Sequence, residues 1–295
     1  MILNYRVCTN DSAKSLKEIL IKKMNISKNL ITILKQNNKI LLNNLNVNIN
    51  FFVIPGDKIT ILLDHAESTK NIEPQNMPLE ILYEDDSIIA LNKPPHIVVH
   101  PTYNHPSGTL ANALAYYFAK TNQSLKIRPV SRLDKGTSGI VIFAKNQYVQ
   151  DCLAKQMKTL CFKKEYIGIV KNHMPEKSGT INLPIARKPG SIISRYISPS
   201  GAPSITHYKI LRLLKYASIV KFNLETGRTH QIRVHCQSVG TPLIGDTLYG
   251  ESSSEIRRQA LHSAKVKLIH PKTKKHLKLY SPLPYDIKGL LKSFI

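Results

Sequence analysis

Cysteine is scarce in this sequence and forms no pattern typical of a zinc site or a disulfide framework. Cys8, Cys152, Cys161 and Cys236 are widely spaced, and none belongs to a CxxC pair. Zinc sites and disulfide scaffolds are built from closely or regularly spaced cysteines. We therefore expect reduced, mostly buried thiols in a cytoplasmic protein, and no metal site.

Long apolar runs and glycine-rich phosphate loops are also missing. No segment approaches the ~18 apolar residues of a transmembrane helix, and residues 1–6 do not begin a signal peptide. No glycine-rich loop is of the kind that cradles the phosphates of a nucleotide. These absences predict a soluble protein that spans no membrane and uses no nucleotide cofactor.

Acidic residues are few relative to basic ones. The chain has 42 Lys and Arg against 19 Asp and Glu, a formal net charge of +23, although 42% of its residues are hydrophobic and can build a sizeable core. A strongly positive protein attracts polyanions, and salt weakens that attraction. Biased codon usage would explain many lysines but not the shortage of acids. We expect nucleic acid as the partner, ahead of an anionic membrane surface.

Residues 1–64 have the pattern of a small α/β unit. Apolar residues at Leu16, Ile19 and Leu20 have helical spacing, and a second helix is expected after Ser27, a suitable N-cap. Short strands follow, with a turn at Pro55-Gly56. This layout resembles the RNA-binding domain named after ribosomal protein S-four. The resemblance implies that Ser27 and Lys28, at the start of the second helix, face RNA.

The remainder of the chain predicts a linker and a larger domain. Residues 65–78 are polar, lack apolar periodicity and are expected to be the linker. Residues 79–295 alternate strand and helix patterns without a regular βαβ repeat. We therefore expect an α+β fold, with a mixed, largely antiparallel sheet flanked by helices.

A carboxylate stands on a turn of small residues before a buried strand. Asp134 lies in the segment Ser131-Arg132-Leu133-Asp134-Lys135-Gly136-Thr137-Ser138-Gly139, which leads into an apolar run. Functional residues favour loops held by rigid strands. From spacing alone, however, an Asx-turn is the better interpretation of this aspartate.

A second polar cluster opens a helix after a strand. It runs from Leu224 to His235, and Thr229 is the expected N-cap. Arg233 lies one turn inward between apolar neighbours, where a cation needs a partner, and Asp134 is a candidate. His230 and His235 are five residues apart and do not share a helix face, so a metal site is not expected. Tyr166, on a predicted strand, is by itself more typical of a core residue.

Taken together, these segments resemble the RluA-type pseudouridine synthases in order and spacing. The matches are Arg-Leu-Asp at 132–134, Lys-Glu-Tyr at 164–166 and the run 226–235, supported by Asn-Lys-Pro at 92–94 and Gly-Asp at 245–246. Two positions depart from the family pattern: Ser131 replaces a common histidine, and Gly136 stands where an acid is frequent. Both bear on RNA contacts or loop geometry more than on chemistry.

The resemblance implies roles for named residues. Asp134 would be the nucleophile or the carboxylate that stabilises the detached sugar, with Arg233 as its ion-pair partner. Tyr166 would stack on the target base and assist proton removal from its ring. The uridine must be flipped out of folded RNA, and Arg132 would fill the vacated space. Further RNA contacts are expected from Arg228, His230, Asn92 and Lys93. The isomerisation is redox-neutral and implies no cofactor.

The RNA substrate is less clearly indicated than the reaction. Residues 257–278 contain eight Lys or Arg and no acid, giving a second basic patch besides the N-terminal unit. An added RNA-binding domain favours a large structured substrate, so large-subunit rRNA is expected ahead of tRNA, with the enzyme acting as a monomer. Alternatives are a non-catalytic RNA-binding or ribosome-assembly protein, and a magnesium-dependent nuclease.

Overall fold

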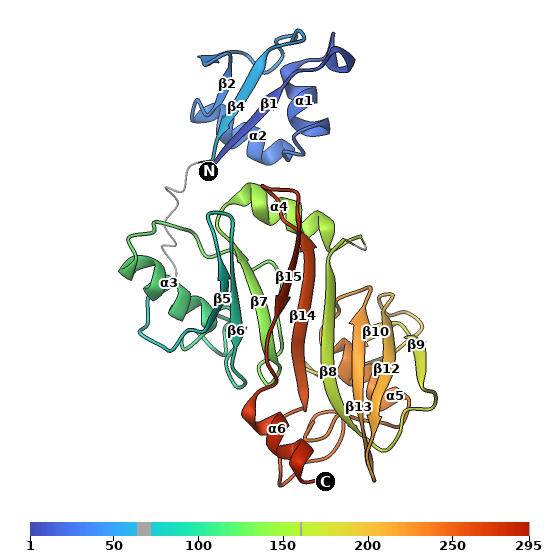
Figure 1. Ribbon diagram of the computed structural model, residues 1–295. Helices are drawn as coiled ribbons and strands as arrows, with labels where there is room; N and C mark the ends of the chain where they lie inside the picture. The colour runs from blue at the N-terminus through green and yellow to red at the C-terminus, as the bar shows by residue number, and fades with distance from the viewer. Residues whose placement is uncertain (64–71, 160, 295) are drawn as a thin grey trace.

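The computed structural model describes residues 1–63, 72–159 and 161–294. Two sheets dominate the described chain: a four-stranded one near the N-terminus and a nine-stranded one in the larger part (Figure 1). The nine-stranded sheet is antiparallel except where β7 pairs with β14. The mixed, largely antiparallel α+β fold expected from the sequence is confirmed.

The N-terminal unit is a short sheet with two helices against it. Ser27 caps the second helix by accepting a hydrogen bond from the backbone N–H of Leu30, as the sequence predicts. The strand order is β1-β4-β2-β3. The elements are β1 (Ile2–Arg6), α1 (Leu16–Lys22), α2 (Lys28–Gln36), β2 (Ile40–Leu42), β3 (Leu45–Asn46) and β4 (Lys58–Leu62), with a 3-10 turn at Thr9–Asp11.

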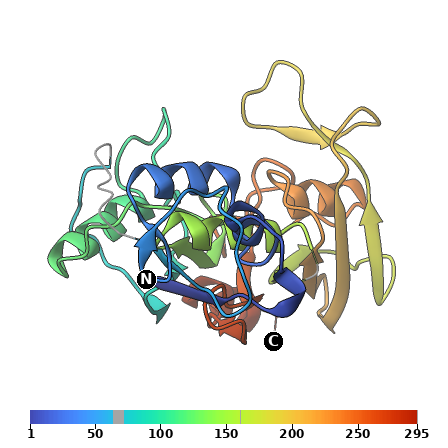
Figure 2. The same cartoon turned by 90° about the horizontal axis from the view of Figure 1, so that it is seen from above.

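The larger unit is built on the nine-stranded sheet, in the order β5-β6-β7-β14-β8-β13-β12-β9, with β15 also paired to β14. Its strands are β5 (Ile81–Glu84), β6 (Ile88–Lys93), β7 (Ser138–Ala144), β8 (Lys163–Lys171), β9 (Ser178–Asn182), β12 (Ile205–Leu213), β13 (Ala217–Leu224), β14 (Leu261–Ile269) and β15 (His276–Tyr280). Its helices are α3 (Leu110–Lys120), α4 (Gln147–Gln156), α5 (Gln231–Ser238) and α6 (Tyr285–Lys292). A separate hairpin, β10 (Ile185–Arg187) with β11 (Arg195–Ile197), projects from the body (Figure 2).

Strand β7 is buried on both faces, as its unbroken apolar run predicts. Ile140 and Ile142 pack in the core that α4 covers, whereas Val141 and Phe143 pack in the core beneath α3. Successive strand side chains point to opposite faces, so one strand supports both cores. The sequence that follows the Asp134 turn is thereby fixed in the centre of the fold.

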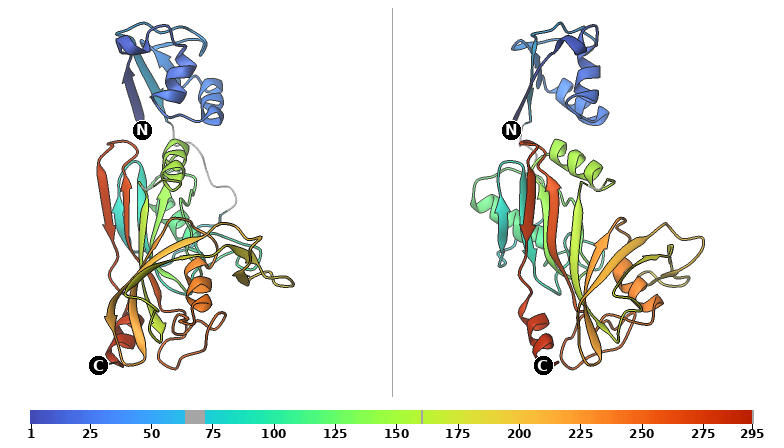
Figure 3. Two further views of the ribbon diagram at one scale, coloured as in Figure 1. Left: turned by 90° about the vertical axis from the view of Figure 1, so that its right-hand side faces the viewer. Right: turned by 45° about the vertical axis from the view of Figure 1, so that its right-hand side comes forward.

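The N-terminal unit contacts α4 of the larger unit. Its hydrophobic core is continuous with the core that includes α4. Ser27 Oγ donates a hydrogen bond to Asp151 at 2.6 Å, and Lys155 Nζ donates to the Asn25 side chain. Figure 3 shows α4 between the N-terminal unit and the sheet, with the C-terminus at the far end.

Part of the predicted linker packs against the larger unit. Residues 65–71 lie outside the described residues, so the domain boundaries stay a prediction. Residues 72–78 pack against the start of α3: Gln75 Oε1 accepts from the Gly108 N–H at 2.7 Å, and Ile72 is 7% exposed. The hydrogen bond of Gln75 and the burial of Ile72 attach the end of the predicted linker to the larger unit.

Candidate active site

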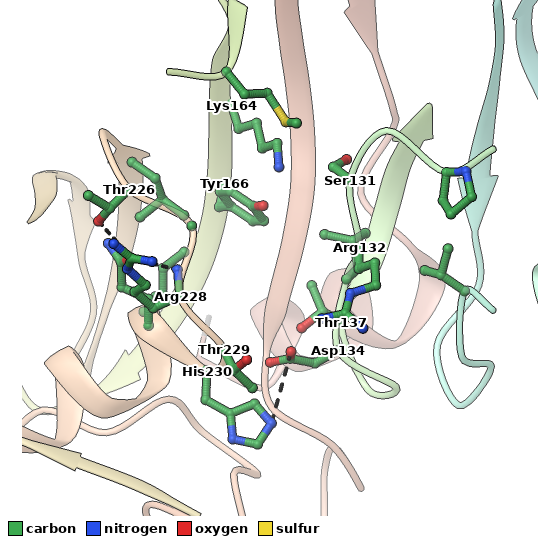
Figure 4. A pocket seen from close by; sticks show the side chains of 18 of the residues that line it. Ser131, Arg132, Asp134, Thr137, Lys164, Tyr166, Thr226, Arg228, Thr229 and His230 are labelled. Atoms are coloured by element: carbon green, nitrogen blue, oxygen red, sulfur yellow. Dashed lines mark hydrogen bonds and ion pairs between the residues drawn. The ribbon is translucent and has the colours of Figure 1, made fainter. Parts of the chain in front are cut away.

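A cleft of about 1050 Å³ lies between the Asp134 loop, the start of β8 and the segment that leads into α5 (Figure 4). The three residues to which the sequence analysis assigns the chemistry, Asp134, Tyr166 and Arg233, all line it. The predicted RNA contacts Arg132, Arg228 and His230 line it as well. Segments far apart in the sequence thus meet at one site.

The Asp134 turn is closed by backbone atoms, so the carboxylate is left for the cleft. The Thr137 N–H donates to the Asp134 carbonyl at 3.0 Å. An Asx-turn would require the side chain to accept a backbone amide, and within the described ranges no such bond reaches this carboxylate. The Asp134 side chain is 25% exposed and faces Arg233 of α5 and His230 at the start of that helix.

Two buried basic residues, Lys93 and Arg258, donate hydrogen bonds to carbonyls of the Asp134 turn. Lys93 Nζ donates to the carbonyls of Pro94 and Ile97, both at 2.8 Å, and to that of Lys135 at 3.2 Å. Burial and the nearby Arg258 lower the pKa of Lys93 to about 7. Arg258 in turn donates to the Gly136 carbonyl at 2.8 Å.

Arg258 also ties the turn to the C-terminal helix. Its guanidinium makes two bonds to Asp286, at 2.6 and 2.9 Å, in the first turn of α6. A bidentate pair of this kind fixes both partners in orientation. The backbone that follows Asp134, at Lys135 and Gly136, is therefore anchored to rigid elements.

Two positions near Asp134, Gly139 and Gly136, leave little space for a side chain, each for a different structural reason. Gly139 has φ +109°, and a Cβ there would lie 2.3 Å from the Ser263 carbonyl oxygen, where β7 and β14 pair. Only glycine adopts this conformation without strain. At Gly136, one of the two departures from the resembled pattern, a Cβ would lie 2.5 Å from Gln259 Oε1. In this chain the glutamine side chain occupies that space.

Arg233 links two carboxylates. Its Nη1 lies 3.5 Å from Asp134 Oδ2, and its Nε and Nη2 each donate to Asp246 at 2.7 Å. Burial by itself would lower the pKa of Arg233, but the Asp246 bonds and charge raise it on balance. The predicted pairing with Asp134 is present, and Asp246 is a second, closer partner that the pairing argument missed.

His230 faces the other oxygen of the Asp134 carboxylate. Its Nε2 lies 4.0 Å from Asp134 Oδ1, and Figure 4 shows the ring directed toward the carboxylate. Burial lowers the pKa of His230, so the ring is neutral at neutral pH. His230, with φ 58° and ψ 19°, is the N-cap of α5 and makes no side-chain cap bond. The prediction of Thr229 as N-cap is therefore wrong, because a left-handed residue separates it from the helix.

Tyr166 and Lys164 lie on the cleft face of β8 (Figure 4). Tyr166 is 5% exposed, and burial together with the Asp134 charge raises the pKa of its phenol. The phenol is thus protonated at neutral pH. Burial lowers the pKa of Lys164 to about 8, and no carboxylate among the described residues pairs with it.

Four predicted RNA contacts lie outside the cleft lining. Lys93 is fully buried, which corrects the prediction: its ammonium binds backbone carbonyls and is closed to a phosphate. Asn92 donates to Glu80 and accepts from Ser281, and so bridges structural neighbours. Ser27 gives its hydroxyl to Asp151. Lys28 is exposed at the start of α2.

The remaining predicted features concern metals, thiols and membranes. In residues 1–63, 72–159 and 161–294, no group of three His, Cys, Asp or Glu could hold a metal. All four cysteines are free, but Cys8 and Cys161 are exposed, contrary to the mostly buried thiols expected. None of the helices in the described parts of the chain is long and apolar enough to span a membrane.

Comparisons with known proteins identify the family. A family model described as RNA pseudouridylate synthase matches residues 87–238, just over half of the chain. The human RNA pseudouridylate synthase domain containing 1 has a structure that covers 76% of this chain and 97% of its own, at a TM-score of 0.58 and 25% identity. The human RNA pseudouridylate synthase domain containing 4 has a structure that matches at a TM-score of 0.60. Its identity is 19%, so this match shows a likeness of fold.

Curated relatives extend the match to most of the chain. YjbO of Bacillus subtilis (strain 168), an uncharacterized RNA pseudouridine synthase, is 36% identical over 270 residues, 91% of this chain and 95% of its own. Ribosomal large subunit pseudouridine synthase D of Buchnera aphidicola subsp. Schizaphis graminum (strain Sg) is 39% identical over 254 residues, 81% of this chain and 80% of its own. The chain therefore belongs to the RNA pseudouridine synthases, the isomerases that convert uridine to pseudouridine in RNA.

Proposed function

We propose that this enzyme modifies uridines of large-subunit rRNA and that Asp134 carries out the chemistry. The observation that carries the proposal is the position of Asp134 in the cleft, 3.5 Å from Arg233, with Tyr166 lining the same cleft. A carboxylate with an arginine partner, open to a cleft that an extruded nucleotide can enter, is suited to a reaction on a sugar–base bond.

Pseudouridine formation breaks the N–C glycosidic bond, turns the uracil and rejoins it through carbon. An aspartate is ionised at neutral pH and needs no external base to act as a nucleophile or to stabilise the detached sugar. Arg233, 3.5 Å from one oxygen, orients the carboxylate toward the cleft. Because Asp246 fixes Arg233 in turn, the whole group is set before substrate arrives.

Tyr166 is assigned to the target base. Its ring lines the cleft beside Asp134, and its raised pKa keeps the hydroxyl protonated. A neutral phenol presents a flat ring on which uracil stacks. Proton removal from the uracil ring by Tyr166 would first require the phenol to lose its own proton.

The target uridine must leave the RNA stack to reach Asp134. Extruding a base costs a few kcal/mol, which contacts to the opened RNA offset. Arg132 is exposed at the cleft and has no carboxylate partner in the described part of the chain. We assign it to the space that the flipped base vacates, with Arg228 contacting the flanking backbone.

The assignment to rRNA is supported by size and by relatives. Several relatives at 35–39% identity are named ribosomal large subunit pseudouridine synthase D. The basic N-terminal unit offers a second RNA-binding surface, which suits a large substrate. We further propose that the enzyme acts in the cytoplasm as a monomer.

The substrate is tested by mapping pseudouridines in rRNA and tRNA from cells with and without this chain. Loss of one or more rRNA sites, restored by the wild-type chain but not by Asp134→Ala, is expected. Loss confined to tRNA would overturn the rRNA assignment. Full modification by Asp134→Ala would overturn the assignment of the chemistry to Asp134. Activity that survives a chelator excludes the magnesium-dependent nuclease.

A further inference from the structure

Tyr249 connects the β10–β11 hairpin to the Asp134 site. Its hydroxyl oxygen accepts a hydrogen bond from the backbone N–H of Arg195, in β11, at 2.8 Å. The same oxygen lies 2.8 Å from His230 Nδ1. Its ring lies 4.9 Å from the Arg233 guanidinium. Tyr249 is 5% exposed, so these contacts are made in a largely dry setting.

The hydrogen bonds that join Arg195, Tyr249 and His230 have one arrangement in which each donor has an acceptor. A backbone amide can only donate, so the Tyr249 oxygen accepts from Arg195. No other acceptor for the Tyr249 proton is present among the described residues, so the hydroxyl donates to His230 Nδ1. Burial raises the pKa of Tyr249 and keeps that proton in place. A neutral imidazole that accepts at Nδ1 carries its hydrogen on Nε2.

We infer that Tyr249 is a positioning residue, which fixes the His230 tautomer whose Nε2–H faces the Asp134 carboxylate; this inference rests on the proposed role of Asp134. The Nε2 to Oδ1 separation is 4.0 Å, longer than a hydrogen bond. Such bonds are often long in free enzymes and tighten in the substrate complex. With Arg233 on its other oxygen, Asp134 would then be held from two sides.

The backbone at His230 supports this inference independently. A left-handed conformation is uncommon outside glycine and costs of order 1–3 kcal/mol at a non-glycine residue. His230 adopts it with φ 58° and forms no side-chain cap bond with α5. Its ring is instead placed between Tyr249 and Asp134. Strain of this kind persists at functional sites when surrounding contacts determine it.

The tautomer itself is measured by NMR of the full chain labelled with ¹⁵N-histidine, at neutral pH. His230 is assigned by its loss in His230→Gln. We expect the proton on Nε2 in the wild type and a shift toward Nδ1–H in Tyr249→Phe, which keeps the ring. A wild-type proton on Nδ1 would overturn the inference. This readout needs no activity, so it stands apart from the test of Asp134.

Kinetics test whether the tautomer matters. Tyr249→Phe is expected to lower kcat by about three- to tenfold with KM unchanged. A Gln at position 230 always has an amide N–H to donate, so adding Tyr249→Phe to His230→Gln should lower kcat no further. Equal losses in both backgrounds would contradict the inference. Tyr148→Phe, which removes another buried hydroxyl, 3.3 Å from Lys274 Nζ, is the control and should leave kcat unchanged.

Discussion

Arg233 binds Asp246 more closely than it binds Asp134. The two bonds to Asp246 are 2.7 Å each, whereas the approach to Asp134 is 3.5 Å. Asp246 is 1% exposed, while the Asp134 side chain is 25% exposed. The two carboxylates that share this arginine thus differ in setting: one is a buried anchor and the other faces the cleft.

The division between anchor and cleft residue predicts opposite effects of mutation. Asp246→Ala leaves Arg233 buried without its main partner and should lower the free energy of unfolding by about 3–5 kcal/mol. Asp134→Ala should abolish activity and change stability by less than about 1 kcal/mol. Denaturant unfolding of both variants measures the difference. Equal destabilisation by the two would contradict the assignment of Asp246 as the anchor.

Lys164 predicts a pH dependence of RNA binding. Its pKa of about 8 means that it is charged below pH 8 and neutral above, so a contact from Lys164 to an RNA phosphate in the cleft would be lost as pH rises from 7 to 9. We expect RNA affinity to fall about tenfold over this range. Lys164→Arg, which stays charged, should flatten the dependence. Lys163→Arg, outside the cleft lining, is the matched control and should keep the wild-type profile.

Lys93 titrates near the same range, but its ammonium is enclosed by three carbonyls and cannot bind RNA directly. An effect of Lys93 titration would instead appear in the free energy of unfolding. The Lys164→Arg variant does not alter that contribution. A wild-type affinity that stays constant between pH 7 and 9 would show that Lys164 does not contact RNA.

Gly139 is predicted to be intolerant of any side chain. Alanine there would require a positive φ and would place Cβ 2.3 Å from the Ser263 oxygen. Gly139→Ala should therefore destabilise the protein by about 2 kcal/mol or more. Gly227→Ala is a suitable control, since a Cβ there meets nothing within 4 Å. Thermal unfolding of the two variants provides the comparison, and similar midpoints would contradict the prediction.

Three lysines stand side by side on neighbouring strands. Lys267 is directly opposite Lys163 on β8 and Lys278 on β15, and all three are exposed. Like charges in cross-strand register repel, so Lys267→Glu should raise the free energy of unfolding by about 1 kcal/mol at low salt. The gain should shrink at high salt, because ions screen surface charges. A decrease in stability at low salt would contradict this account.

Much of the fold was predictable because its elements have strong local patterns. The residue patterns of 205–213 and 217–224 predict two strands, and the structure has β12 and β13 with these bounds. β9, β10, β11 and β15 were not predicted, because they are short or polar and depend on partners distant in sequence. β15 begins in the basic run 257–278 and ends just beyond it, and the nearby lysines hide the alternation of its buried Leu279 with exposed neighbours.

The site was predictable as a set of residues but not as a network. Asp134 and Arg233 do approach each other, but neither spacing nor charge indicates that Asp246 takes two of the arginine's bonds. Lys93 has the composition of a surface residue, and only the folded loop supplies three carbonyls to bury it. The left-handed turn at His230 also leaves no local signal, because tertiary contacts rather than glycine produce it.

The most direct measurement is release of the C5 hydrogen from tritiated uridine in RNA by Asp134→Asn. Joining C5 to the sugar displaces this hydrogen, so its release reports the reaction itself. Asn keeps the size of the side chain but lacks its negative charge. The account predicts a fall in rate of at least about a thousandfold, with RNA affinity and unfolding midpoint close to wild type. A variant with near wild-type release would contradict the central role of Asp134.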